Sequence, residues 1–179
     1  MSVKARTLRT GFATVHQLPL NPALSASPAS AGGVRSQPMK IISAAIEIGA
    51  PPMTVWAVIT DLGSYREWNP LFREASGEVA VGETITLRSV HPVNGRTMTV
   101  KPKIIVAEPG VELRWAAGLP GIIGGEHIFA LTPRNGGTRL VQSESFRGLL
   151  APFSRRTMAN TSTSFRELNE ALKKRAEAG

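Results

Sequence analysis

The sequence predicts an α+β domain in which a curved antiparallel sheet of about seven strands wraps around a long C-terminal helix. Three observations predict this fold. An alternating strand pattern comes first and is followed by two short helices, strand patterns separated by turn residues come next, and a helical apolar stripe ends the chain. A sheet of this length twists and curls, so its concave face can hold the final helix and leave a cavity.

The first strand is predicted over residues 41–48, where apolar side chains recur at every second position from Ile42 to Ile48. Pro51 and Pro52 end strand pairing and can open a helix over residues 53–59. A second short helix or turn follows, and it carries Tyr65, Trp68, Asn69 and Pro70.

Six further strands are predicted from β-branched and aromatic residues between short turns. Turn chemistry separates most of them, for example at Pro109-Gly110 and at Asn135-Gly136. Short connections and regular spacing favour an antiparallel meander. The predicted strands cover residues 72–79, 84–90, 97–107, 111–116, 126–132 and 138–146.

The last helix is predicted to begin near Pro152. Its apolar stripe falls at steps of three and four residues, which places the stripe on one helix face that must pack against a partner surface. Basic residues in the final turns suit the C-terminal end of a helix. The stripe consists of Met158, Thr161, Phe165, Leu168 and Leu172.

Composition excludes several classes of protein. The chain has no cysteine, so disulfides, thiolate nucleophiles and cysteine-ligated metals are excluded, and no apolar run reaches the roughly 18–20 residues that a membrane-spanning helix needs. The net charge of +8 suggests anionic partners, yet four of the basic residues precede Met39 and the others are not interleaved with aromatic residues. We therefore expect no nucleic-acid partner, and no phosphate loop, zinc spacing or redox motif implies a metal or cofactor.

Residues 1–38 are rich in Ser, Ala, Pro and Gly, contain no acidic residue and show no periodicity, so we predict a disordered extension. Two interpretations remain open. The segment resembles an organelle transit peptide, or it is an upstream extension of a domain that covers residues 39–179. The expected location is cytoplasmic, with organelle import as the alternative.

Two motifs carry a family resemblance. The first runs from Pro51 through Val55-Trp56 to Asp61 and continues in Tyr65-x-x-Trp68-Asn69-Pro70; the second joins Gly125-Glu126-His127 to Glu144-x-Phe146. Together they resemble the polyketide cyclase/dehydrase and lipid-transport superfamily, SRPBCC, also described as START-like or birch-pollen-allergen-like, and within it a bacterial branch without a settled reaction. The resemblance implies a helix-grip fold. It does not fix an activity, because this superfamily includes carriers, cyclases, receptors and chaperone activators.

The predicted concave face of the sheet is almost entirely apolar, as a hydrophobic pocket requires. His127 and Glu144 are the exceptions, and a hairpin turning near Asn135-Gly136 would bring them together on that face. A nearby carboxylate would raise the pKa of the imidazole, giving an acid–base pair or an anchor for a ligand; alternatively, the two groups only satisfy each other. Ligand contacts are predicted for Trp68, Leu87, Met98, Val100, Leu113, Trp115, Phe129, Gln142, Phe146, Met158 and Phe165.

The loop over residues 118–125 is rich in glycine and carries Ile122 and Ile123. Exposed isoleucines are costly, so this segment is either a lid over the pocket, able to touch a membrane transiently, or a packed hairpin loop.

Three functions follow from these patterns. The first is binding of a small hydrophobic molecule, such as a lipid, polyketide, isoprenoid or aromatic compound, by a monomer or homodimer. The second is a cyclase or dehydratase that uses His127 and Glu144. The third is a protein-interaction module, which predicts a filled core without a cavity.

Overall fold

The computed structural model describes residues 40–90, 95–119, 123–147 and 155–179. The predicted disordered extension over residues 1–38 lies outside the described residues. The order of elements begins with strand β1 (Lys40–Ile48), helix α1 (Pro52–Thr60), the short 3-10 helix η1 (Leu62–Ser64) and helix α2 (Tyr65–Trp68). Pro52 opens α1 as predicted, since its fixed φ suits the first turn and its missing N–H has no intrahelical acceptor there.

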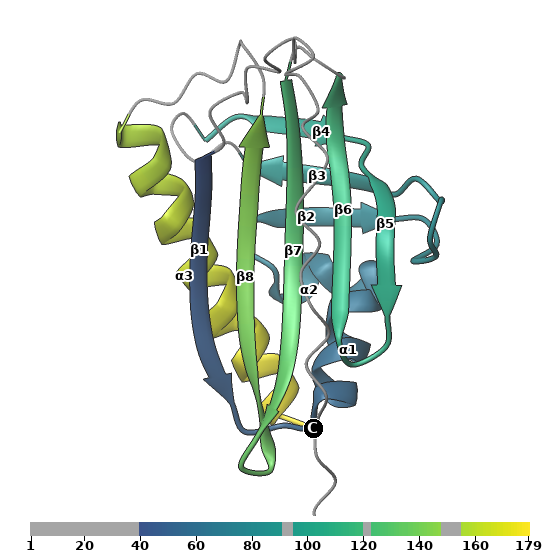
Figure 1. The fold of residues 1–179 in the computed structure, drawn as a ribbon, viewed down its shortest axis with the longest axis vertical. Coiled ribbons are helices and arrows are strands. Elements are labelled where there is room, and N and C mark those ends of the chain that lie inside the picture. The colour runs from purple at the N-terminus through teal and green to yellow at the C-terminus, as the bar shows by residue number, and fades with distance from the viewer. Residues whose placement is uncertain (1–39, 91–94, 120–122, 148–154) are drawn as a thin grey trace, which may run out of the picture. The chain divides into compact units, whose positions relative to one another are not determined.

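The described strands form two antiparallel sheets. The five-stranded sheet has the order β1-β8-β7-β6-β5, and the three-stranded sheet has the order β2-β3-β4. The strands of the smaller sheet run crosswise to those of the larger one (Figure 1). The remaining strands are β2 (Phe72–Ser76), β3 (Thr86–Val90), β4 (Thr97–Val100), β5 (Lys103–Glu108), β6 (Glu112–Leu119), β7 (Ile123–Arg134) and β8 (Gly137–Arg147).

The prediction of a single strand over residues 97–107 is wrong. The segment is divided between β4 and β5, which belong to different sheets. Pro102 lies at the break, where it has no N–H to donate to a ladder, while its carbonyl oxygen accepts the N–H of Ile85 at 3.0 Å. The chain turns at this point, which gives eight strands in the described residues rather than about seven.

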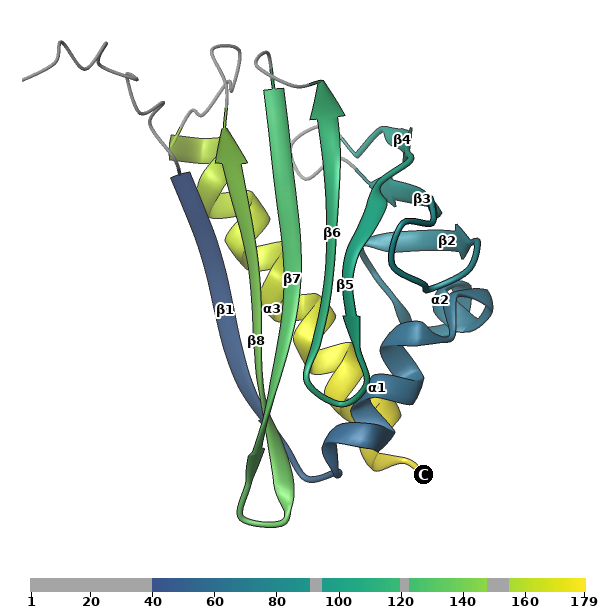
Figure 2. The same cartoon turned by 45° about the vertical axis from the view of Figure 1, so that its right-hand side comes forward.

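The long helix α3 (Arg155–Glu177) crosses one face of the five-stranded sheet diagonally, beside β1 (Figure 2). Its predicted stripe faces inward: Phe165, Leu168 and Leu172 are buried. They belong with the sheet residues Leu113 and Leu140 to the fully buried part of the molecule. Burying a leucine side chain stabilises the fold by about 2 kcal/mol, so this stripe is the main energetic link between helix and sheet.

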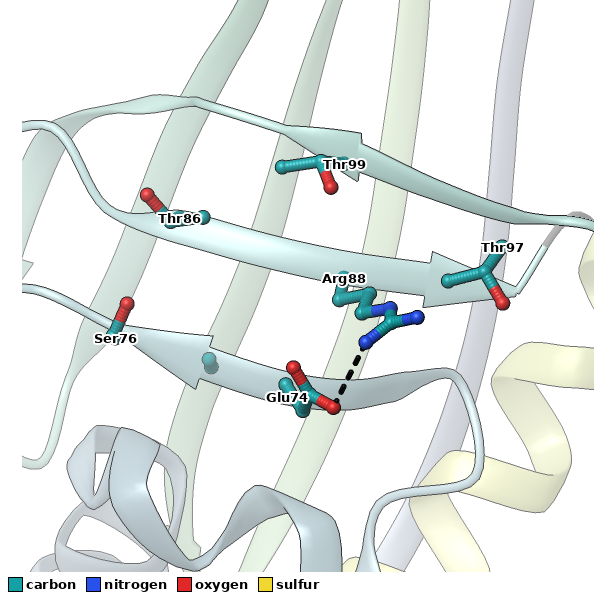
Figure 3. A pocket seen from close by; sticks show the side chains of 7 residues that line it. Glu74, Ser76, Thr86, Arg88, Thr97 and Thr99 are labelled. Carbon is teal, nitrogen blue, oxygen red and sulfur yellow. Dashed lines mark hydrogen bonds and ion pairs between the residues drawn. The ribbon is translucent and has the colours of Figure 1, made fainter.

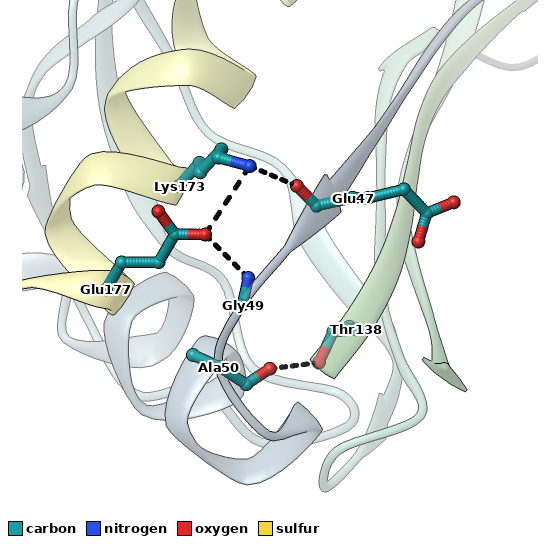
Figure 4. A network of polar contacts seen from close by, with 6 residues as sticks. All are labelled: Glu47, Gly49, Ala50, Thr138, Lys173 and Glu177. Atoms are coloured by element: carbon teal, nitrogen blue, oxygen red, sulfur yellow. Dashed lines mark hydrogen bonds and ion pairs between the residues drawn. The ribbon is translucent and has the colours of Figure 1, made fainter. Parts of the chain in front are cut away.

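Hydrogen bonds fix the C-terminal end of α3 to the end of β1 (Figure 4). The Glu177 carboxylate accepts the backbone N–H of Gly49 at 2.6 Å, and Lys173 Nζ donates to the carbonyl oxygen of Glu47 at 2.7 Å. The bond from Gly49 lowers the pKa of Glu177, since it stabilises the ionised carboxylate. Nearby, the hydroxyl of Thr138 donates to the carbonyl oxygen of Ala50 at 2.7 Å. We call Glu47, Gly49, Lys173 and Glu177 the helix anchor.

The start of β8 passes very close to the end of β1 at Gly137. A Cβ atom placed on Gly137 would overlap the carbonyl oxygen of Ile48, which is backbone and cannot rotate away. We expect Gly137→Ala to lower the free energy of unfolding by about 2–4 kcal/mol, because β1 and β8 must separate. Denaturant unfolding measures this change.

Gly63→Ala is the matched control, because a Cβ atom there meets only Asp61 Oδ1 at an ordinary 3.7 Å. We expect a change within about 0.5 kcal/mol for this variant. Equal stabilities of the two variants would contradict the close packing at Gly137.

Candidate functional site

A pocket of about 410 Å³ lies between the two sheets and the N-terminal half of α3. This volume is within the range of small-molecule binding sites and much larger than packing defects in a protein core. All three layers contribute to its wall: Leu87 and Val100 from the small sheet, Trp115 from the large sheet and Phe165 from the helix. Most of the lining is apolar.

Side chains alternate between the two faces of a strand, so the small sheet has an apolar face toward the pocket and a polar outer face. Leu87 and Val100, which are register partners on β3 and β4, face inward. The outer face carries the threonines shown in Figure 3 and an ion pair between Arg88 and Glu74 at 3.1 Å. Both charged side chains are more than half exposed, and exposed pairs contribute little binding or stabilising energy. The inner pocket is therefore the stronger candidate site.

Aromatic side chains surround His127, which is 4 % exposed. The Trp115 ring stacks on the imidazole with centroids 4.9 Å apart and an interplanar angle of 9°. The rings of Phe72, Phe129 and Phe165 lie at centroid distances of 5.8, 4.9 and 5.2 Å from the imidazole. The histidine is thus enclosed by groups that cannot solvate a positive charge as water does.

Two polar side chains from β8 lie near this imidazole, and one of them makes a hydrogen bond to it. Gln142 Nε2 lies 3.0 Å from His127 Nε2, and since an amide nitrogen can only donate, the imidazole Nε2 is the acceptor. The proton of a neutral ring then sits on Nδ1. The strand register places Glu144 opposite His127, with Oε2 at 3.9 Å from Nδ1, which is too long for a hydrogen bond.

Burial controls the protonation of both groups. It lowers the pKa of His127 to about 3, because the aromatic enclosure penalises the imidazolium. It also raises the pKa of Glu144 to about 7, because its carboxylate is poorly hydrated. The expectation that the carboxylate would raise the pKa of the imidazole is wrong, since desolvation outweighs attraction to a carboxyl that is itself partly protonated near neutral pH.

Two buried side-chain oxygens, Gln142 Oε1 and Asn169 Oδ1, have no hydrogen-bond partner among the described residues. The two side chains reach the same level of β1: Ala44 is the register partner of Gln142, and its carbonyl oxygen lies 3.4 Å from Asn169 Nδ2. An unsatisfied buried acceptor costs about 1–3 kcal/mol. Both oxygens lie behind the pocket wall, and neither residue is part of the lining.

The predicted ligand-contact and lid residues divide into four groups. Those that line the pocket, with His127 and Glu144, are Leu87, Met98, Val100, Trp115, Phe146 and Phe165. Leu113, Phe129 and Gln142 are buried but are not part of the lining, and Trp68 lies in a surface groove with Pro70 and Arg166. Ile122 and the side chains of Ile123 and Met158 lie outside the described residues.

Sequence reasoning missed Phe72 and Asn169. Phe72 opens β2 with its side chain buried against Trp115 and His127, and its position two residues after the Asn69-Pro70 turn was the available signal. The side-chain oxygen of Asn69 fixes the start of β2, because it accepts hydrogen bonds from the backbone N–H groups of Leu71 and Phe72 at 3.0 and 2.8 Å. Asn169 lies four residues after Phe165, and this helical spacing puts both on the inner face of α3.

No cluster of three potential metal ligands occurs in the described part of the chain. Among the helices of that part, none combines the length and hydropathy required to cross a bilayer.

We expect Glu144→Gln to change how stability depends on pH. The pKa of Glu144 is about 7 in the folded protein against 4.5 for the free group, so the folded state holds a proton that the unfolded state releases between these values. Wild-type stability is therefore lost relative to Glu144→Gln as pH rises through this window, by on the order of 1.4 kcal/mol per pH unit. Urea unfolding at several pH values measures this difference.

Glu126→Gln serves as the charge-matched control, because Glu126 lies on the neighbouring strand β7 and pairs with Arg114 at 3.8 Å outside the pocket. Parallel pH profiles for the wild type and Glu144→Gln would contradict the raised pKa of Glu144.

Comparisons with known proteins agree with this architecture. A search of curated proteins finds no match. Among solved structures, a START superfamily protein from Mycobacterium smegmatis has 15% identity and a TM-score of 0.64, covering 77% of this chain and 97% of that one. The crystal structure of Ara h 8.0201 has 14% identity and a TM-score of 0.62, covering 79% of this chain and 100% of that one. The Zhui aromatase/cyclase from Streptomyces sp. R1128 has 16% identity and a TM-score of 0.60, with 78% and 94% covered.

These similarities establish the helix-grip fold that the sequence motifs implied. The sequence of residues 39–177, nearly the whole of the described chain, matches the family polyketide cyclase/dehydrase and lipid transport. This protein therefore belongs to the family described as polyketide cyclase/dehydrase and lipid transport.

Proposed function

We propose that the protein binds a small hydrophobic molecule in the pocket between its two sheets and α3. The observation that carries the proposal is the pocket itself: about 410 Å³ lined mainly by apolar and aromatic side chains, inside a domain whose core is otherwise tightly buried. Family membership is consistent with such a role. An interaction module with a filled core is less well supported, because it gives this volume no purpose.

Apolar burial supplies the affinity in this proposal. A two-ring aromatic molecule that buries about 300 Å² of apolar surface gains roughly 7 kcal/mol before the cost of association. A dissociation constant on the order of 10 µM is therefore the tightest that this burial alone gives, and the cost of association raises the value that is measured. His127, Glu144 and the hydroxyl groups of Ser89 and Ser164 would orient the molecule rather than supply most of its binding energy.

An acid–base enzyme of the cyclase or dehydratase kind is the second candidate. The observation that favours it is a pair of titratable groups in one pocket whose pKa values burial moves in opposite directions. Against it, the hydrogen bond from Gln142 occupies Nε2 and leaves the ring proton on Nδ1. A neutral imidazole in this state has no free lone pair to accept a substrate proton, so binding is the better supported function.

A tryptophan at position 164 tests the binding proposal. Ser164 lines the pocket from α3, and we expect Ser164→Trp to fill the volume and weaken binding of the neutral dye N-phenyl-1-naphthylamine at least about tenfold, since the dye loses its apolar contacts. Fluorescence titration measures the loss, and circular dichroism checks that the variant is folded.

Thr163→Trp is the matched control, because Thr163 is the preceding residue of α3 and its side chain is exposed outside the pocket. It should bind the dye as the wild type does. If both variants bind equally well, the dye does not use this pocket; if the wild type binds neither this dye nor an apolar naphthalene, the proposed function is wrong.

A further inference from the structure

The described wall of the pocket carries a single charged side chain. Among the described residues that form its wall, Glu144 is the acidic one and there is no lysine or arginine. His127 is the other titratable group, and its aromatic enclosure keeps it neutral at physiological pH. This contrasts with the chain as a whole, which carries a net charge of +8.

The described residues packed around Glu144 bring no cation to it. Its register partners are Ile42 on β1 and His127 on β7, and its Oε1 lies beside Gly125, which has no side chain. Helix α3 contributes Thr161, Ser164 and Phe165 to the same wall. Lys40 and Arg147, at the ends of β1 and β8, are exposed and do not line the pocket. Within the described wall, a bound anion would therefore meet a carboxyl group without a compensating positive charge.

The hydrogen-bonding groups of the site also disfavour an anionic ligand. The Glu144 carboxylate presents acceptor oxygens at the pocket wall, and His127 Nδ1, at 3.9 Å from Oε2, is too far away to donate a hydrogen bond to it. Acceptors in excess are satisfied by a hydroxyl or N–H group, whereas a carboxylate offers only further acceptors.

We propose that the pocket selects uncharged hydrophobic molecules that carry a hydroxyl or N–H donor, and discriminates against hydrophobic molecules that carry a carboxylate. This inference rests on the proposed function, since it concerns the ligand of the same pocket. Discrimination comes from the electrostatic cost of an unpaired anion beside Glu144, together with the donors that a carboxylate lacks.

Three naphthalenes of similar size test the inference: 2-methylnaphthalene, 2-naphthol and 2-naphthoate. Their affinities are measured by displacement of N-phenyl-1-naphthylamine at about pH 8, where Glu144 is mostly ionised. We expect 2-naphthol to bind most tightly and 2-naphthoate at least about tenfold more weakly than 2-naphthol, because an anion buried without a partner costs several kcal/mol.

Two charge-neutralising variants locate the source of this discrimination. Glu144→Gln removes the charge, so the repulsion is gone. The ratio of the 2-naphthoate to the 2-naphthol dissociation constant should then fall by about tenfold or to near one. Glu126→Gln removes a negative charge from the neighbouring strand outside the pocket, and it should leave this ratio of dissociation constants unchanged.

The outcomes separate the two proposals. Binding of 2-naphthoate as tight as that of 2-naphthol, or an unchanged ratio of their dissociation constants in Glu144→Gln, would overturn the charge selection while 2-methylnaphthalene binding still supported a hydrophobic pocket. Failure of the dye and of all three naphthalenes to bind would overturn the proposed function and the inference with it.

Discussion

The structure depends on the contact between the apolar stripe of α3 and the concave face of the five-stranded sheet. Leu168 and Leu172 lie in this contact without measurable exposure, as do Leu113 and Leu140 on the sheet side. A single helix cannot fill the whole width of a curled sheet, so the two surfaces separate where α3 passes Phe165 and Thr161. The pocket is a geometric result of this packing, and its apolar walls are core positions that no longer meet a partner.

The same desolvation that stabilises the core determines the chemistry of the pocket. Aromatic rings on several sides of His127 exclude water, so the imidazole stays neutral and its one acceptor nitrogen is used by Gln142. Glu144 lies toward the pocket rather than inside the aromatic cluster, and its side chain keeps 25% of its surface accessible. The histidine is therefore part of the wall, and the carboxyl group is the more accessible of the two to a bound molecule.

Most of the fold was predictable because its determinants are local. Alternation in β1, the proline pair before α1 and the stripe of α3 each specify an element within a few residues. The division at Pro102 was missed because residues on both sides have similar strand propensity, and only the crossing of two sheets separates them. His127 and Glu144 were found by their polarity on an apolar face. Their pKa values were not, because these depend on Trp115, Phe72 and Phe165, which come from three distant elements.

The helix anchor at Glu47, Gly49, Lys173 and Glu177 holds the C-terminal end of α3, and the pocket borders its N-terminal half. The two ends of the described helix thus contribute differently to the stability of the domain. Side chains near the anchor are packed in the core, so changing them affects the stability of the whole domain. Those at Thr161 and Ser164 face the pocket, where a change of side-chain volume disturbs less packing. Divergence among relatives can accumulate at the second set with little loss of stability, so one scaffold can acquire new ligands by exchanging a few residues on two turns of one helix.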